Sequence, residues 1–338
     1  MGEGSAIGIV APDGVPEIRP GDDLAALLLP LLDLRDGDIL IVTSKIVSKA
    51  EGRVRDGDRD SALAEETDRL VARRGPTSIV RTRLGLTMAA AGIDASNVEA
   101  GRIVLLPLDP DASARRLREA VLTRTGRVVG VIVTDTAGRA WREGQTDIAV
   151  GAAGVRVAEP YGGRVDAYGN ELAVTLPAVA DEIAGAAELA QHKLGARPVA
   201  VLRGRADLVL PADDHGPGAA ALVRPEAGDL FGYGAREAVL RALEGRAGDD
   251  RGFGAVATPE EIAEGLARLA HHGVEVLASP GTAPGTAPGT VPGAPEEGRL
   301  AVRGPREVLE AVAFAHRWRV TRDGDDPPGI LRLHPASP

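Results

Sequence analysis

The chain has 338 residues, 44% of them hydrophobic, and a formal net charge of −10. It can therefore form two globular domains, or one large domain with an appendage. Aromatic residues are only 2%, and no basic tail or stripe is present, so nucleic-acid binding is disfavoured. The absence of cysteine excludes disulfides, thiolate metal sites and cysteine nucleophiles. The N-terminus lacks the basic segment followed by an apolar segment that is typical of a secretory signal peptide. No apolar run in the sequence is long enough to span a bilayer. We therefore expect a cytoplasmic protein without a membrane partner.

Short β-branched runs alternate with alanine-rich stretches over the first 245 residues. The β-branched runs predict strands at residues 39–43, 103–107, 128–134 and 199–202. Apolar residues at helical spacing predict helices at residues 60–74, 112–124 and 178–194. The expected class is mixed α/β, and the pattern leaves the order and direction of the strands open.

The stretch GRAGDDRGFG, residues 245–254, predicts a boundary between a first domain, residues 1–248, and a small α/β appendage, residues 255–338. Within the appendage we expect a helix capped at Thr258, a strand at residues 272–277, a helix at residues 306–317 and a strand beginning at Trp318. The proline-, glycine- and threonine-rich run at residues 279–297 is a near-repeat of PGTx and predicts an extended loop or tether.

Only three of the 39 basic residues are lysine, and two of these, Lys45 and Lys49, lie in the segment TSKIVSK. A lysine ammonium is a compact charge that fits between phosphate oxygens where a planar guanidinium does not. The two lysines therefore suggest a phosphate ligand. The alternative is two solvated side chains retained by chance.

Common nucleotide-binding and hydrolase motifs are missing. There is no G-x-x-x-x-G-K-[ST] loop, no G-x-G-x-x-G between a strand and a helix, no G-x-S-x-G, and no histidine spacing typical of a metal site. A nucleotide, if bound, is bound in a less common way.

Two short segments carry candidate metal ligands. Asp135 lies between two threonines where the predicted strand 128–134 ends, and strand ends are where α/β proteins bind ligands. Asp94 lies in the polar cluster Asp-Ala-Ser-Asn, residues 94–97. Two aspartates from separate loops suit a magnesium ion that also binds phosphate. The alternatives are that Asp135 caps a turn and that Asp94 forms an Asx-turn or helix cap.

A third polar segment, RAWREGQ at residues 139–145, follows Asp135. Arg139, Arg142 and Gln145 give it an unusual density of long polar side chains, which favours an anionic substrate.

Several separated motifs together resemble one family. They are VPEI (residues 15–18) before RPGDDL, VTSKIVSKAEGR, AAAGIDASNV, VIVTDTAGRAWREGQTDIAVGAAG, DAYGNEL and VADEIA. Over about residues 6–245 the chain resembles the coenzyme F420-0 gamma-glutamyl ligases, and in particular the N-terminal ligase domain of the two-domain actinobacterial protein.

The resemblance implies an unusual α/β fold without a P-loop, a homodimer with intertwined chains, and GTP-dependent addition of L-glutamate to a deazaflavin coenzyme precursor. It also implies that two divalent cations, magnesium or manganese, are bound, and it is compatible with an additional potassium ion. The implied reaction transfers the γ-phosphoryl group of GTP to the terminal carboxylate of the precursor, and the amine of glutamate then displaces phosphate.

Matched motif by motif, the resemblance also implies roles for individual residues. The implied catalytic residues are Lys49, Asp94 and Asp135. The two aspartates would bind one metal ion and Thr136 the second. The implied GTP contacts are Val15, Pro16, Glu17, Ile18, Ser44, Lys49 and Asn97. Family members make further metal and nucleotide contacts near residues 188–193, where ELAQHKLG departs from the acidic pattern expected of the family.

In the two-domain relatives the ligase is followed by a flavin-binding domain of roughly two hundred residues. Only residues 255–338 remain here, so no flavin is expected. Two other functions stay open at this point. One is a metal-dependent phosphotransferase or phosphohydrolase acting on GTP, and the other is a non-catalytic GTP-binding regulator.

Overall fold

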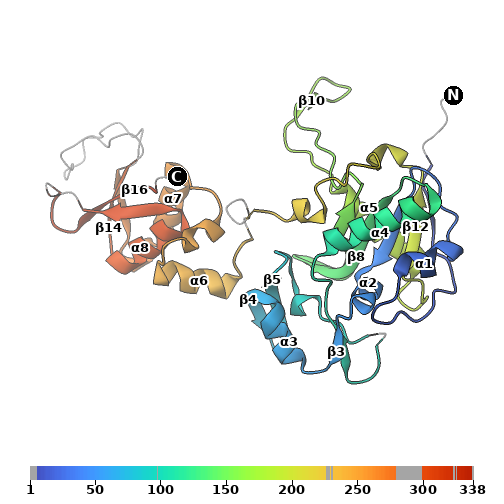
Figure 1. Ribbon diagram of the computed structural model, residues 1–338. Helices are drawn as coiled ribbons and strands as arrows, with labels where there is room; N and C mark the ends of the chain where they lie inside the picture. Colours follow the sequence, from blue (N-terminus) through green and yellow to red (C-terminus); the bar gives the residue numbers. More distant parts are fainter. Residues whose placement is uncertain are drawn as a thin grey trace. The chain divides into compact units, whose positions relative to one another are not determined.

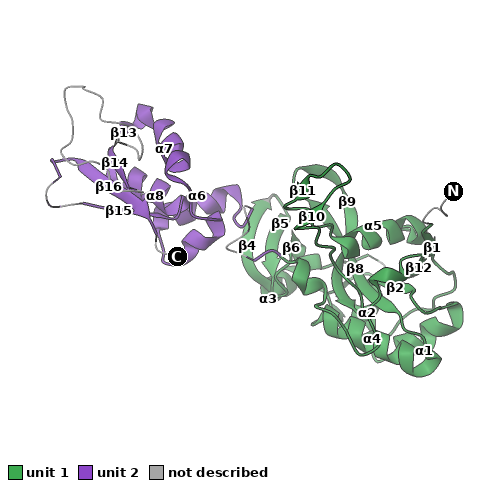
Figure 2. Ribbon diagram, turned by 90° about the horizontal axis from the view of Figure 1, so that it is seen from above, with its two compact units in different colours: residues 1–223 green, residues 224–338 purple. Residues whose placement is uncertain are grey.

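The computed structural model describes residues 6–96, 98–225, 229, 231–278, 299–322, 324 and 326–336. The chain divides into two compact units, residues 1–223 and residues 224–338 (Figure 2). Each unit contains both helices and strands around its own hydrophobic core, so the expected mixed α/β class is confirmed.

A five-stranded sheet forms the centre of the first unit (Figure 1). In spatial order its strands are β1 (Gly8–Val10), β12 (Val199–Arg203), β2 (Ile39–Thr43), β8 (Gly130–Arg139) and β9 (Arg142–Ala153). β2 and β8 run parallel, and the other neighbours are antiparallel. The parallel pair therefore ends at one edge of the sheet, where Thr43 lies opposite Thr134.

Helices cover both faces of this sheet. Along β2, Leu40 and Val42 pack into a core with α1 (Leu24–Leu28), α2 (Ser44–Ala50) and α4 (Pro110–Thr125). Ile39 and Ile41 point the other way, toward α5 (Val179–Gln191). Burial on both faces explains the continuous apolar runs in β2 and β8.

Smaller elements surround the sheet. They are α3 (Arg59–Glu66), the paired strands β3 (Val54–Asp56) and β7 (Arg102–Val104), the three-stranded sheet β4 (Thr67–Arg74), β5 (Thr77–Thr82) and β6 (Thr87–Ala89), and the hairpin β10 (Arg164–Val165) with β11 (Glu171–Leu172). The β10–β11 hairpin extends away from the body of the first unit (Figure 1).

The helix predicted at residues 60–74 is wrong in its second half. The chain leaves the helix at Thr67 and continues as β4, which pairs with β5. Gly75 and Pro76 form the two-residue connection, with Gly75 at φ 55°. A Gly-Pro pair followed by the β-branched run TSIVRT is a hairpin signal, and this pairing overrides the helical spacing.

The other predicted elements of the first unit occur with shifted ends. The helix predicted at residues 112–124 is α4, which is capped by Asp109 and ends at Gly126 with φ 68°. The helix predicted at residues 178–194 ends earlier, because His192 adopts φ 54°. The strand predicted at residues 103–107 is the shorter β7, whereas β8 continues beyond the predicted residue 134 to Arg139.

Two charged side chains of α4, Arg118 and Asp111, hold the last part of the first unit against the sheet. Arg118 is 3% exposed and donates hydrogen bonds to the backbone oxygens of Val129, Leu210, Pro211 and Asp214. The Asp111 carboxylate accepts from the backbone N–H groups of residues 152, 219 and 220. Residues 205–222 are thus held by charge-assisted hydrogen bonds as well as by apolar packing.

The second unit contains the four-stranded antiparallel sheet β13 (Glu275–Ala278), β14 (Leu300–Arg303), β16 (Ile330–Pro335) and β15 (Trp318–Thr321), in that order, with α6 (Ala235–Glu244), α7 (Pro259–Ala267) and α8 (Arg306–Ala315). The predicted cap at Thr258 and the start of a strand at Trp318 are confirmed. Residues 245–254 lie within this unit, and the predicted domain limits stay a prediction. The tether predicted at residues 279–297 lies outside the described residues.

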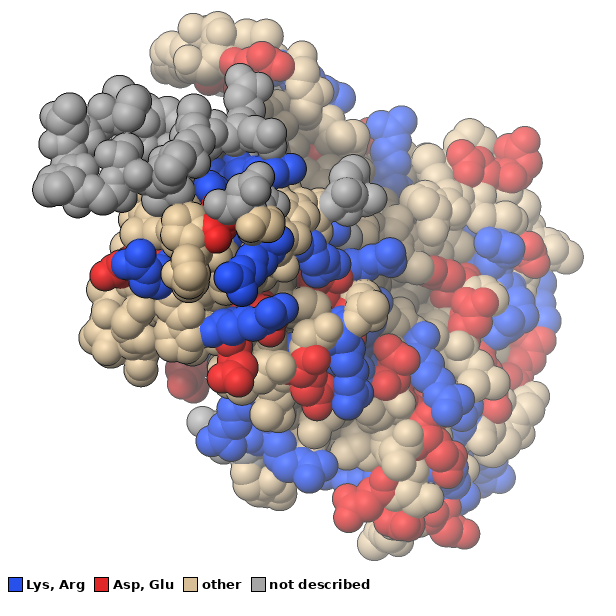
Figure 3. Space-filling view, turned by 90° about the vertical axis from the view of Figure 1, so that its left-hand side faces the viewer, with Lys and Arg blue, Asp and Glu red and all other residues tan. Residues whose placement is uncertain are grey.

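Opposite charges are interspersed on the face of the molecule that Figure 3 shows. Figure 3 shows Lys and Arg side chains alternating with Asp and Glu side chains on one face of the molecule. Within the described part of the chain, each helix is too short or too polar to cross a lipid bilayer.

Candidate functional site

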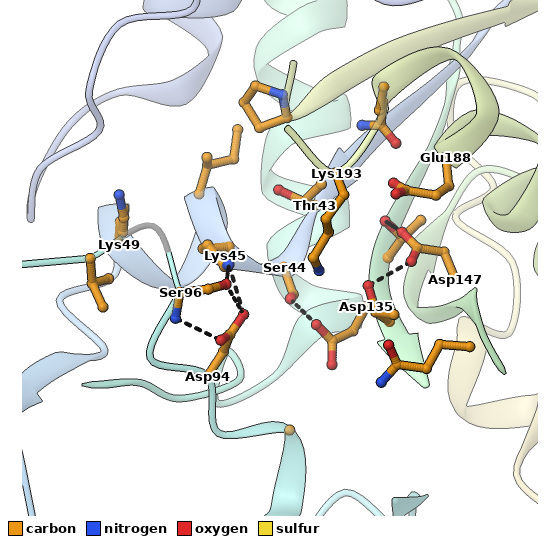
Figure 4. A pocket seen from close by; sticks show the side chains of 18 of the residues that line it. Thr43, Ser44, Lys45, Lys49, Asp94, Ser96, Asp135, Asp147, Glu188 and Lys193 are labelled. Atoms are coloured by element: carbon orange, nitrogen blue, oxygen red, sulfur yellow. Dashed lines mark hydrogen bonds and ion pairs between the residues drawn. The ribbon is translucent and has the colours of Figure 1, made fainter. Parts of the chain in front are cut away.

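A cavity of ≈ 1070 Å³ opens where β2 and β8 end. Because the two strands are parallel neighbours, their carboxyl ends meet at one edge, as is usual for ligand sites of α/β sheets. Ser44 begins α2 directly after β2, and Asp135 follows Thr134 on β8. The Ser44 hydroxyl donates to Asp135 Oδ1 over 2.9 Å, which joins two segments 91 residues apart (Figure 4).

Asp135 lies next to a second carboxylate, Asp147 on β9. Asp147 is 3% exposed and accepts hydrogen bonds from the hydroxyls of Thr134, at 3.3 Å, and Thr136, at 2.8 Å. Burial, with the negative charges of Asp147 and Asp94, raises the pKa of Asp135 to about 7. This carboxyl group thus lies in a site where a cation would be stabilised.

Asp94 has the opposite electrostatic environment. Burial alone would raise its pKa, but hydrogen bonds from Lys45 and from Ser96 lower it to about 2. The Lys45 ammonium lies 2.7 Å from Asp94 Oδ2 and 2.8 Å from the Ser96 hydroxyl. The backbone N–H of Ser96 donates to Asp94 Oδ1 over 2.7 Å, so the Asx-turn interpretation also holds.

Lys49 lies at the other side of the cavity, in the last turn of α2. It is 7% exposed, and its ammonium lies 2.5 Å from Glu17 Oε1, whereas the Glu17 side chain is largely exposed. Lys193 enters the cavity from the loop after α5 (Figure 4). All three lysines of the chain therefore line one cavity, which makes retention by chance a poor explanation.

Most of the sequence-predicted site residues meet in this cavity. Its lining includes Val15, Pro16, Glu17, Ile18, Ser44, Lys45, Lys49, Asp94, Asp135, Thr136 and Gln145. Arg139 and Arg142 form the next strand pair beyond Gly138 and Gln145, outside the lining. Asn97 lies outside the described residues. The roles assigned to these residues stay predictions.

Sequence reasoning assigned no role to several polar residues of the lining, among them Asp147, Glu188 and Gln191, and marked residues 188–193 only as a departure from the family's acidic pattern. Burial and the charge of Asp147 raise the pKa of Glu188. Gln191 is 2% exposed, and neither polar atom of its side-chain amide has a hydrogen-bond partner in the structure. A buried amide without partners on a cavity wall can bind a ligand. The sequence signal that could have identified Gln191 is that this amide side chain occupies a position of the apolar face near the end of the predicted helix 178–194.

The residues of the cavity fit a metal ion only together with a phosphate ligand. Among the described residues, no three His, Cys, Asp or Glu side chains are grouped closely enough to form a metal site by themselves. Magnesium is commonly bound by one or two carboxylates, with waters and substrate phosphates completing its coordination. Asp94 and Asp135, from separate segments, supply that minimal set.

Comparison with known proteins decides the family. The model of the F420-0:Gamma-glutamyl ligase family matches residues 14–204, more than half of the chain. This chain belongs to the F420-0:gamma-glutamyl ligase family. The expected family is thus confirmed, and with it the enzyme class, a ligase.

Three archaeal relatives of this ligase carry the name coenzyme F420:L-glutamate ligase. The protein of Archaeoglobus fulgidus is 42% identical over 213 residues, which are 57% of this chain and 85% of the relative. That of Natronomonas pharaonis is 44% identical over 206 residues, 53% of this chain and 79% of the relative. That of Methanopyrus kandleri is 37% identical over 239 residues, 64% of this chain and 93% of the relative.

The raised pKa of Asp135 gives a test of the site without substrates. The folded-state pKa of about 7 lies above the ordinary 3.8, so the stability due to this group is present below about pH 4 and lost as the pH rises through 7. We expect Asp135→Asn to stabilise the ligand-free ligase at pH 8, on the order of 2 kcal/mol, and much less at pH 5.

Thermal unfolding at the two pH values, with a chelator present, measures this difference. Asp13→Asn, at a largely exposed position, is the control and should change Tm little at either pH. An Asp135→Asn effect of equal size at pH 5 and pH 8 would contradict the assigned pKa.

Proposed function

We propose that the chain joins L-glutamate to the terminal carboxylate of a coenzyme F420 precursor, with GTP as co-substrate, and so forms a γ-glutamyl tail. The family membership and the names of the relatives support the glutamate and coenzyme substrates. The proposal that GTP is the co-substrate is supported by one observation: all three lysines, together with Asp94 and Asp135, line the same cavity.

In the proposed first step, a carboxylate oxygen of the precursor attacks the γ-phosphorus of GTP. The bond between that phosphorus and the bridging oxygen breaks, GDP leaves, and an acyl phosphate forms. Lys49, 7% exposed at the end of α2, is proposed to hold the phosphates together with Ser44 and residues 15–18. The buried position of Lys49 strengthens its interaction with phosphate, because water screens it less.

In the second step, the neutral amine of L-glutamate attacks the acyl carbon and the bond from that carbon to the phosphate oxygen breaks. Inorganic phosphate leaves, and the nitrogen gives up a proton as the amide forms. Neither step needs a nucleophilic side chain, which suits a cavity lined by lysines, aspartates and hydroxyls. Arg139, Arg142 and Gln145 are proposed to hold the carboxylates of the substrates.

We assign one divalent cation, magnesium or manganese, to Asp94 and Asp135, and a second to Thr136. When bound, these cations would supply positive charge at the γ-phosphoryl oxygens. Glu188 and the Gln191 amide oxygen, on the same wall as Asp147, offer further oxygen ligands where the sequence lacks the expected acidic pattern. A potassium ion is part of this proposal, and a flavin is not.

The assay that tests the function combines GTP, magnesium or manganese, L-glutamate and the unglutamylated coenzyme, and follows the mass of the coenzyme and the release of GDP. We expect one GDP for each glutamyl unit gained, and no GDP when glutamate or coenzyme is omitted. GDP release without both substrates would instead indicate a phosphohydrolase. Binding of GTP without any turnover would indicate a regulator.

Replacement of the buried lysine tests the phosphate contact. In Lys49→Arg the planar guanidinium must occupy a pocket filled by a compact ammonium, so kcat/KM for GTP should fall by about tenfold or more. Arg116→Lys, at a side chain 61% exposed on α4, is the control and should keep full activity. Full GTP-dependent activity of Lys49→Arg would exclude the proposed role.

We also propose a homodimer, supported by the arm that the β10–β11 hairpin forms. Apolar side chains on and beside this hairpin are largely exposed: Val165 at 62%, Tyr168 at 92%, Val174 at 92% and Leu176 at 61%. Light scattering should give twice the chain mass of 34.8 kDa, and Tyr168→Asp with Val174→Asp should halve it. A wild-type mass of one chain would contradict the proposal.

A further inference from the structure

The positively charged side chains that line the cavity differ in how the protein balances their charge. Among the described residues, the lining contains five of them: Lys45, Lys49, Arg59, Lys193 and Arg197. Three of the five have a carboxylate of the protein close by, so their charge is largely balanced before any ligand binds. These pairs are Lys45 with Asp94 at 2.7 Å, Lys49 with Glu17 at 2.5 Å, and Arg197 with Asp13 at 2.7 Å.

Lys193 also has carboxylates in its surroundings. It enters the side of the cavity that carries Asp135, Asp147 and Glu188 (Figure 4). Burial and the charge of Asp147 raise the pKa of Glu188, and the positive charge of Lys193 partly offsets that rise. Arg59 differs from the other four, because within the described part of the chain its guanidinium forms no ion pair.

The place of Arg59 in the fold does not explain its presence by helix stability. Arg59 is the first residue of α3 and follows the N-cap residue Asp58. The Asp58 carboxylate accepts a hydrogen bond from the backbone N–H of Asp60, as expected at this end of a helix. A positive side chain in the first turn is unfavourable, because the helix dipole has its positive end there.

The Arg59 side chain points from α3 toward the segment that carries Asp94. Its Nη2 donates to the backbone oxygen of Ile93 over 3.4 Å, which is a long hydrogen bond. Asp94, the next residue, exchanges backbone hydrogen bonds of 3.0 and 2.8 Å with Val104, so this segment is held in place. A guanidinium has several N–H donors, and one long hydrogen bond leaves most of them available to a ligand.

The chemistry of the guanidinium favours a carboxylate as that ligand. Two of its N–H groups can bond to both oxygens of one carboxylate, whereas a lysine ammonium acts as a point charge. Lys49 is proposed above to hold the phosphates. Arg139 and Arg142, proposed above to hold carboxylates, lie one strand pair beyond the lining. Arg59 lines the cavity itself and lies beside the proposed metal ligand Asp94.

We propose that Arg59 binds a substrate carboxylate inside the cavity, beside Asp94. This inference rests on the proposed function, in which both the coenzyme acceptor, through its terminal carboxylate, and L-glutamate supply carboxylates. Either source fits the guanidinium, and the experiment distinguishes them. A carboxylate paired with Arg59 is repelled less by the phosphates of GTP, so both anions can approach each other in one cavity.

The test measures KM for the coenzyme acceptor, for L-glutamate and for GTP in Arg59→Gln and Arg59→Lys. We expect Arg59→Gln to raise KM for a carboxylate substrate by about ten- to hundredfold, the range for a lost hydrogen bond between charged groups. Arg59→Lys keeps the charge but loses the two parallel donors, so it should recover part of the loss. KM for GTP should not change in either variant.

Arg55→Gln is the matched control. Arg55 lies on β3, outside the lining, and its guanidinium lies 2.8 Å from the carboxylate of Glu65 on α3. The change removes one positive charge beside the same helix without altering the cavity. KM for all three substrates should remain at the wild-type value.

A rise confined to the carboxylate substrates would support the inference, and the substrate with the larger rise is the source of the bound carboxylate. A rise of similar size in KM for GTP, or no change in any KM, would overturn the inference while leaving the ligase function intact.

If the wild type joins glutamate to no acceptor, the proposed function fails, and binding decides the role of Arg59 separately. Calorimetric titration then uses L-glutamate and the unglutamylated coenzyme, each alone with magnesium. Binding that is weakened in Arg59→Gln but kept in Arg55→Gln would support a carboxylate site. Equal binding to the wild type and to Arg59→Gln, or no binding to the wild type, would overturn it.

Discussion

The parallel pairing of β2 with β8 is the constraint on which the site depends. It sets Thr43 opposite Thr134, so the residues that follow, Ser44 and Asp135, meet at one sheet edge. A shift of one residue in this register would turn Asp135 to the other face of the sheet. The apolar packing on both faces of β2 therefore fixes the register and, with it, the position of the polar groups of the cavity.

Charge in the cavity is balanced unevenly. Asp94 has a strong partner in Lys45 and a low pKa, whereas Asp135 faces other carboxylates and has a high one. Two aspartates of one cavity thus differ in how strongly each holds a proton. The unbalanced side, with Asp135, Asp147 and Glu188, is the side where positive charge lowers the free energy most.

The sequence predicted best what depends on local chemistry. Short apolar runs rich in β-branched residues located β2 and β12, and the retained lysines pointed to a cavity that all three of them line. It failed where tertiary pairing decides: β4 has helical apolar spacing but pairs with β5. Asp147 was missed because it enters the site only through the register of β9 against β8. Such a placement depends on contacts between strands, which no short window of sequence contains.

The hydrogen bonds of Arg118 bear on where the ligase part of the chain can end. The family match stops at residue 204, yet three of the four strong acceptors of this buried guanidinium lie at residues 210, 211 and 214. A fragment cut at residue 204 would leave Arg118 in the core with Val129 as its remaining acceptor, at a cost of several kcal/mol. A piece of the ligase that keeps these hydrogen bonds must therefore extend at least to residue 214, ten residues beyond the segment that the family model matches.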